Sequence, residues 1–92
     1  MPRYLIEVPH EDNKKACDLA VNIFKSTGSH FLTNADFGCK DGVHMAWINV
    51  DVNSKSEALR VVPPSFRDKT KVIGIEKFAL EHVDKTLRPH HK

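Results

Sequence analysis

The chain has 92 residues, of which 40% are hydrophobic and 28% are charged. A chain of this length buries one modest core, which excludes a multidomain enzyme, and its apolar fraction is too high for general disorder. Fourteen Lys and Arg against twelve Asp and Glu give a net charge of +2, too small an excess for the counterion-release binding of a nucleic-acid module. One soluble domain is the expected class.

The N-terminus and the cysteines predict the compartment. Met1-Pro2-Arg3 leads straight into a strand-like segment, without the apolar region and cleavage site of a secretory signal. The apolar runs are far shorter than the roughly 20 residues that span a bilayer. Cys17 and Cys39 do not form the dense disulfide framework of small secreted domains. We therefore expect a cytoplasmic protein with reduced thiols that binds neither membranes nor nucleic acid.

The N-terminal third predicts a strand and a helix. Residues 3–8 alternate between apolar and polar and stop at Pro9, which cannot donate to a β-ladder. A helical stripe begins at residue 13 and ends near Gly28, which suits the left-handed position after a helix. Its expected buried positions are Ala16, Leu19, Ala20, Ile23 and Phe24, widened by Cys17 and Val21.

The middle of the chain predicts a β-hairpin. Residues 30–37 contain β-favouring side chains and are expected to form a second strand. A turn follows at residues 38–42, where Asp41-Gly42 is a hairpin signal because glycine adopts positive φ without penalty. Residues 43–52 form the clearest predicted strand.

The C-terminal third predicts a helix and a last strand. Ser54 and Glu57 fit a capping box, and Pro63-Pro64 ends the helix. The strand is expected over residues 70–78. The buried side of the helix should consist of Ala58, Leu59, Val61 and Val62.

This β-α-β-β-α-β order predicts a ferredoxin-like α+β fold, with a four-stranded antiparallel sheet and two helices on one face, because the crossovers are right-handed. Residues 1–78 are expected to form this domain. Residues 79–92 would be a C-terminal extension, with a short helix over residues 80–87 and then a frayed tail.

Both faces of the predicted sheet carry large apolar residues. One face has Tyr4, Ile6, Val8, Ile48, Val50 and Val52, and the other has Leu5, Met45 and Trp47. Uncovered, the second face would exceed the apolar patch that monomers usually expose. We expect a homodimer packed sheet against sheet around a cavity. The alternative is that residues 80–87 fold across this face and leave a monomer.

Three segments carry a family resemblance: residues 30–39 (HFLTNADFGC), 41–47 (DGVHMAW) and 63–67 (PPSFR). They resemble a family of small uncharacterised bacterial proteins that is similar to the dimeric α/β-barrel superfamily, and the likeness extends to about residue 78. It implies a homodimer in a bacterial cytosol. That superfamily includes muconolactone isomerases, cofactor-free monooxygenases, metal-binding proteins and ligand-sensing modules. None of their catalytic motifs matches this chain residue by residue.

Carboxylates supply the catalytic candidates. Alternation places Glu7 between the two sheets near Trp47, where burial disfavours the charged form and tunes a general base. Glu76 is expected on the face of Gly74, where a missing side chain would leave room for a ligand. The alternative for both carboxylates is an ion pair with Arg3, Lys77 or Arg67.

Polar residues complete the predicted cavity. His30 and Asp36 share a parity on the second strand, about 20 Å apart along it, and Asp36 is the second catalytic candidate. Arg67 could bind a substrate carboxylate or cap a helix C-terminus. The candidate ligand-binding residues are His30, Asn34, Trp47, Asn49, Arg67 and Glu76. A cavity with an aromatic wall and few polar groups is typical of small-molecule sites.

Metal binding has weaker support. Asp36, Cys39 and His44 near the hairpin are of metal-ligand types, but no CxxC, HxH or HExxH pattern occurs. Cys17 is expected in the core and His44 as a partly buried, hydrogen-bonded residue. We therefore expect no cofactor. The leading hypothesis is a small-molecule-binding dimer with isomerase-like or cofactor-free monooxygenase-like chemistry. The alternatives are a non-catalytic metal-binding or sensory protein and a structural or interaction module.

Overall fold

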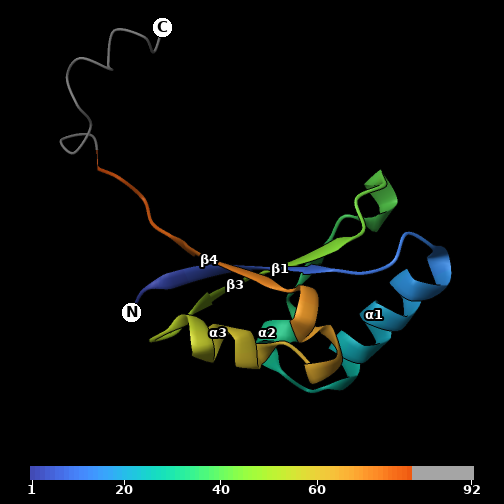
Figure 1. Cartoon of the computed structure of the whole chain (residues 1–92), viewed down its shortest axis with the longest axis horizontal. Helices are drawn as coiled ribbons and strands as arrows, with labels where there is room; N and C mark the ends of the chain where they lie inside the picture. The colour runs from blue at the N-terminus through green and yellow to red at the C-terminus, as the bar shows by residue number, and fades with distance from the viewer. Residues whose placement is uncertain (80–92) are drawn as a thin grey trace, which may run out of the picture.

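An antiparallel sheet of four strands runs through the computed structural model, which describes residues 1–79 (Figure 1). The strands are β1 (Arg3–Pro9), β2 (Asp36–Phe37), β3 (Met45–Asp51) and β4 (Lys71–Ile75). Their order across the sheet is β2-β3-β1-β4. The fold is thus α+β and compatible with the predicted ferredoxin-like arrangement. The helix and tail predicted after residue 79 lie outside the described residues.

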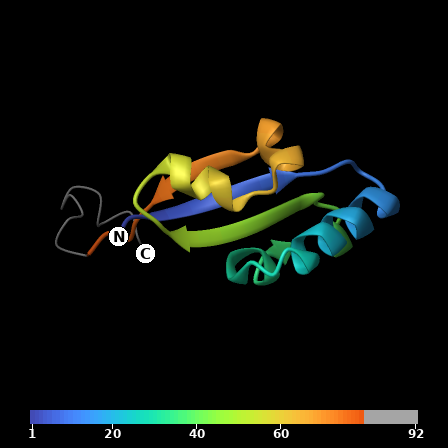
Figure 2. The same ribbon diagram turned by 90° about the horizontal axis from the view of Figure 1, so that it is seen from below.

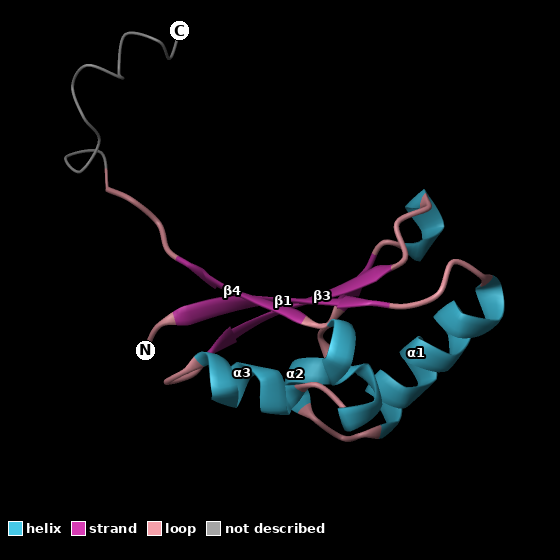
Figure 3. Ribbon diagram, viewed as in Figure 1, coloured by secondary structure: helices cyan, strands magenta, loops and turns pink. Residues whose placement is uncertain are grey.

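Except for one short 3-10 helix, the helical segments cover one face of the sheet (Figures 1 and 3). They are α1 (Lys14–Ser26), α2 (His30–Thr33) and α3 (Lys55–Val61), with the 3-10 helices η1 (Cys39–Asp41) and η2 (Pro64–Lys69). Seen from below, α3 and η2 lie along β4 and β1, whereas α1 and α2 lie on the β3 side (Figure 2). The rings of Phe24 and Phe66 meet between these groups, with centroids 5.6 Å apart. The exception is η1, which lies apart from the other helices, before the start of β3 (Figure 1).

Strand register divides the residues between the two faces. Tyr4 pairs with Val50 and Ile6 with Ile48, and paired residues in an antiparallel ladder share a face. Ile6, Val8, Ile48 and Val50 are at most 3% exposed. The predicted division of β1 and β3 between a helix-covered and an open face is therefore confirmed.

Local capping bonds position the two longer helices. The Asn13 side chain accepts a hydrogen bond from the N–H of Ala16 and begins α1. Ser54 Oγ accepts the N–H of Glu57, whose carboxylate accepts the N–H of Asn53. This arrangement confirms the predicted capping box.

The strand predicted over residues 30–37 is wrong. His30–Thr33 forms a helical turn, and only Asp36–Phe37 pairs with β3. Ser29 Oγ accepts the N–H of Leu32, and the Asn34 amide donates to His30 O. Such side-chain bonds to the nearby backbone compete with strand pairing, so they override the β preference of this segment.

The predicted buried stripe of α1 is shifted. Cys17, Ala20 and Phe24 are its buried residues, whereas Leu19 is 58% exposed. The first turn of the helix therefore directs Cys17 toward the core, whereas the predicted stripe began with Ala16. The reason is tertiary, because the space beneath this turn is filled by polar side chains from three other segments.

The predicted face of Gly74 is also wrong. Gly74 pairs with Tyr4 and Val72 pairs with Ile6, so both lie on the helix-covered face. A Cβ added at Gly74 would lie 3.6 Å from the Tyr4 ring. The missing side chain thus accommodates an aromatic ring of β1. Glu76 lies beyond the end of β4 and is exposed, away from the open face.

Candidate metal centre

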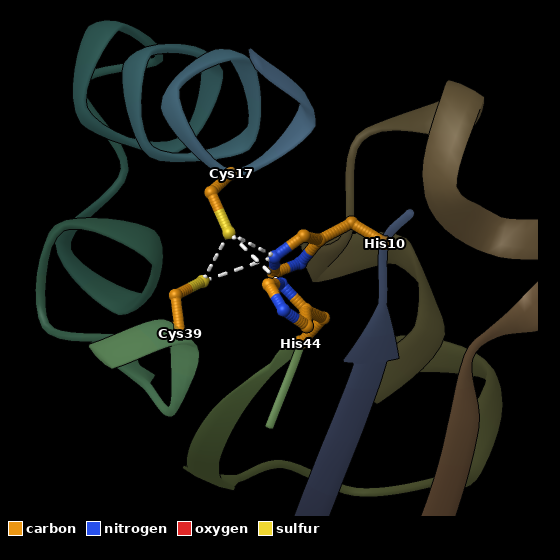
Figure 4. Close-up of side chains that lie close together, drawn as sticks. All are labelled: His10, Cys17, Cys39 and His44. Atoms are coloured by element: carbon orange, nitrogen blue, oxygen red, sulfur yellow. Dashed lines mark hydrogen bonds between the residues drawn. The ribbon is translucent and has the colours of Figure 1, made fainter. Parts of the chain in front are cut away.

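Four metal-ligand side chains converge at one end of the sheet (Figure 4). His10 directly follows β1, Cys17 lies in α1, Cys39 begins η1, and His44 directly precedes β3. Their ligand atoms all lie within 4.8 Å of one another. Cys17 is buried and the other three are partly buried. Two imidazoles and two thiols form the donor set typical of tetrahedral zinc sites.

The ladder between β1 and β3 brings the two histidines together. Pro9 pairs with Met45 at the end of the ladder, and the His10 N–H donates to His44 O at 3.2 Å. His10 and His44 are therefore the next pair in register. Their rings meet edge to face with centroids 5.6 Å apart.

A compact turn positions Cys39. The Gly38 N–H donates a hydrogen bond to Met45 O, and the Val43 N–H donates one to Gly38 O at 2.9 Å. Gly42 closes the turn with φ 80°, a left-handed conformation that glycine adopts without steric cost. The turn is thereby anchored to β3 and holds the Cys39 sulfur beside α1.

The ligand atoms are close-packed. Cys17 Sγ lies 2.6 Å from Cys39 Sγ and 3.1 Å from His44 Nδ1. His10 Nε2 lies 3.0 Å from both sulfurs. Zinc bonds of about 2.3 Å to sulfur and 2.0–2.1 Å to nitrogen place tetrahedral ligand atoms about 3.3–3.8 Å apart. Side-chain movements of less than about 1 Å therefore open the cluster for a metal ion.

The environment of His10 and Cys17 favours their neutral forms. Burial lowers the pKa of His10, and the nearby His44 lowers it further. Burial also raises the pKa of the Cys17 thiol to about 11, assisted by its hydrogen bond to Cys39. A neutral imidazole is ready to bind a metal, whereas a thiol must first release its proton.

A carboxylate orients one of the histidines. His44 Nε2 lies 2.7 Å from Asp12 Oδ1, while its Nδ1 faces Cys17. If Nε2 carries the proton and donates it to Asp12, the Nδ1 lone pair points into the cluster. Metal-binding histidines are commonly held in this way by a carboxylate on the other ring nitrogen.

The structure brings together only two of the three metal ligands predicted from the sequence. Cys39 and His44 belong to the cluster, but Asp36 lies on β2 and is not a member. His10 was missed, and Cys17 was assigned only to the core, where it is indeed buried. The available signal was that His10 follows the strand predicted over residues 3–8, whereas His44 lies near the start of the strand predicted over residues 43–52, and these two strands are neighbours in a ferredoxin-like sheet.

Most of the other candidates gather beside β3, at the edge of the open sheet face. Trp47 Nε1 donates to Glu7 Oε2 at 3.2 Å. A shallow hollow of about 300 Å³ beside them is lined by His30, Asn34, Asp36, Trp47 and Asn49, among others. The separation of about 20 Å expected for His30 and Asp36 assumed a continuous strand. The helical turn of α2 instead brings both to the same hollow.

Arg67 and Glu76 lie elsewhere. Arg67 Nε donates to Val62 O at 2.8 Å and its Nη2 donates to Arg60 O at 3.2 Å. These bonds cap the C-terminal end of α3. Helix capping was the predicted alternative to the binding of a substrate carboxylate by Arg67. Glu76 lines a separate hollow of about 830 Å³ with Arg3 and Tyr4. Among the described residues, the ion pairs predicted for Glu7 and Glu76 do not form within the chain, and Arg3 pairs with Asp51 at 3.2 Å instead.

Comparisons with known proteins give no further information about the site. No family model, curated protein or solved structure matches the chain. Among the described residues, no helix has the length and apolar character needed to cross a bilayer.

Proposed function

We propose that this protein binds one zinc ion through His10, Cys17, Cys39 and His44. The observation that carries the proposal is the convergence of these four donors, from four separate segments, within 4.8 Å. A tetrahedral set of two sulfurs and two nitrogens favours zinc over magnesium or calcium, which prefer oxygen ligands. The carboxylate of Asp12 on His44 adds the outer partner that zinc sites commonly have.

The proposed role of the ion is to hold the fold together. Four protein ligands fill a tetrahedral zinc, whereas catalytic sites keep one position for water. The ligands come from the end of β1, from α1, from η1 and from the start of β3. A zinc ion would thus tie the β2–β3 connection to both the sheet and the first helix. This favours the metal-binding alternative over metal-dependent catalysis.

Metal analysis of untagged protein tests the proposal. We expect close to one zinc per chain after purification, and cobalt(II) that replaces it should give the visible absorption of a tetrahedral thiolate site. Replacement of a ligand in Cys17→Ser, Cys39→Ser or His10→Ala should remove most of the bound metal. Metal-free protein that takes up neither ion at micromolar concentration would contradict the proposal.

Histidines outside the cluster provide matched controls. His30 is exposed and lies in α2, so His30→Ala should retain the metal. The double variant His90→Ala/His91→Ala removes the adjacent histidines near the C-terminus and should also retain it. Loss of metal in the double variant, with retention in His10→Ala, would assign the binding to these terminal residues.

We further propose that the chain forms a ferredoxin-like homodimer through its open sheet face, as in dimeric α/β barrels, in a bacterial cytoplasm. The strand order and the helices on one face are compatible with that fold. The open face carries apolar side chains that are partly exposed, namely Leu5, Met45, Trp47 and Ile73. A second copy packed on this face would cover them. Equilibrium sedimentation tests this, since a monomer at micromolar concentration would contradict it.

A small-molecule site on that face is the second candidate function. It is favoured by the hollow that gathers His30, Asn34 and Asp36 beside Trp47. Glu7, bonded to Trp47, and Asp36 would be its proton-transfer groups. Native mass spectrometry of untagged protein should then detect a copurified organic mass that is lost in Glu7→Gln. A dimer that carries only zinc would count against this candidate.

A further inference from the structure

The two cysteines of the candidate centre are poised between two arrangements. Their Sγ atoms are 2.6 Å apart, and the chain has no other cysteine. A tetrahedral zinc ion would hold two thiolate sulfurs about 3.8 Å apart, whereas a covalent S–S bond measures about 2.05 Å. Small movements of the same side chains therefore lead either to a metal site or to a disulfide.

The two sulfurs differ in exposure. Cys17 is 8% exposed, whereas Cys39 is partly exposed in the η1 turn. Figure 4 shows the two thiols pointing toward one another, on the side of the cluster away from the histidines. A small oxidant that arrives from solvent therefore meets Cys39 first.

We propose that Cys39 and Cys17 form a redox switch that releases the metal when hydrogen peroxide oxidises them, an inference that rests on the proposed zinc site. The Cys39 thiolate attacks one peroxide oxygen, the O–O bond breaks, and hydroxide leaves to give a sulfenic acid. The Cys17 thiolate attacks that sulfur, the S–S bond forms, and the S–O bond breaks with loss of a second hydroxide. The sulfurs lose two electrons, and two protons from solvent complete two waters.

Oxidation removes both anionic ligands at once. Only the imidazoles of His10 and His44 remain, too few to fill a tetrahedral zinc site. The disulfide joins α1 to η1, which are two of the elements that the metal joins. The oxidised chain therefore keeps this cross-link while it loses the ion, and reduction of the disulfide regenerates the site.

Hydrogen peroxide titration of zinc-loaded, untagged full-length protein tests the switch. One equivalent of peroxide should release one zinc per chain to a chromophoric indicator, and the intact mass should fall by two hydrogens. Dithiothreitol should reverse both changes. In metal-free Cys17→Ser, a sulfenic acid should persist on Cys39 and be trapped by dimedone, whereas Cys39→Ser should give little adduct.

The outcomes separate this inference from the proposed function. Zinc that is bound before peroxide and retained after it would overturn the switch and leave the zinc site standing. Reduced protein without zinc would overturn both. Release of zinc with only intermolecular disulfides, or dimedone trapping on Cys17 in Cys39→Ser, would contradict the assignment of Cys39 as the attacking thiol.

Discussion

Asp12 contacts the proposed metal only through a ligand, yet it should matter for affinity. Its carboxylate lies 2.7 Å from His44 Nε2, and loss of such an outer partner typically costs about 10–100-fold in metal affinity. We expect Asp12→Asn to weaken zinc binding by this factor, as measured by competition with a chromophoric chelator. Asp18→Asn is the matched control, because Asp18 lies in the first turns of α1, shortly after Asp12 in the chain, and pairs with Lys14 rather than with a ligand. Equal affinities for both variants would contradict the assigned role.

Zinc affinity should rise with pH because Cys17 must lose its proton. Burial and the neighbouring Cys39 raise the pKa of Cys17 to about 11, so the metal-free chain keeps this proton at neutral pH. Each proton released on binding increases the affinity about tenfold per pH unit. The pKa of His10 is lowered from 6.5, so His10 contributes no released proton above that pH.

Titrations at pH 6.5, 7.5 and 8.5 measure this slope. The slope should decrease in Cys17→Asp, because a carboxylate is already ionised across this range. A pH-independent affinity of the unaltered protein would show that zinc does not displace the thiol proton.

At the scale of elements, the η1 turn connects the metal centre to the open face through Gly38. A Cβ at Gly38 would lie 2.8 Å from Val43 O and 2.9 Å from the Trp47 ring. Gly38→Ala should therefore cost about 1–3 kcal/mol of stability, shift the emission of Trp47 and weaken zinc binding. Gly28→Ala is the control, since its Cβ meets nothing within 4 Å and strain arises only from φ +76°. An unchanged Trp47 emission in Gly38→Ala would contradict the coupling.

Elements with local signals were predictable from sequence, whereas their tertiary placement was not. The predicted Ser54 cap of α3 depends on a bond within four residues. The start of α1 was predicted from its hydrophobic stripe, and the Asn13 side chain caps it there. The α2 turn also depends on local hydrogen bonds. It was nevertheless predicted as a strand, because its side chains favour β structure. Cys17 and His10 came together only through the pairing of β1 with β3 and the rotation of α1, neither of which leaves a short spacing pattern in the sequence.

At the scale of the whole molecule, zinc should contribute a large share of the stability. A ligand that binds only the folded chain at 100 times its Kd stabilises it by about 2.7 kcal/mol. For a domain of this size, that corresponds to a Tm change on the order of 10–20 °C. Calorimetry with and without a chelator should show this drop for the unaltered protein and for His30→Ala, but not for His10→Ala. A chelator-independent Tm of metal-loaded protein would contradict a structural role.

The proposed dimer has a charge arrangement that a twofold axis along the strands would satisfy. Register places Asp36, Trp47, Glu7 and Lys71 in one row across the open face. Asp36 lies on the edge strand β2, and Lys71 lies on the opposite edge strand β4. Such an axis lays the β2 edge of each copy over the β4 edge of the other. Asp36 of each copy then lies opposite Lys71 of the other, which gives two equivalent ion pairs. Opposite charges across an interface fix its register, and like charges penalise it.

A charge exchange tests this geometry. Lys71→Glu alone should place like charges together and raise the dimer Kd at least about tenfold, equivalent to about 1.4 kcal/mol. Asp36→Lys combined with Lys71→Glu restores opposite charges and should recover most of the affinity in sedimentation equilibrium. The rescue should weaken at high salt, because exposed charges are screened. A double variant no tighter than the single one would rule out this axis, even if the open face still carries the dimer contact.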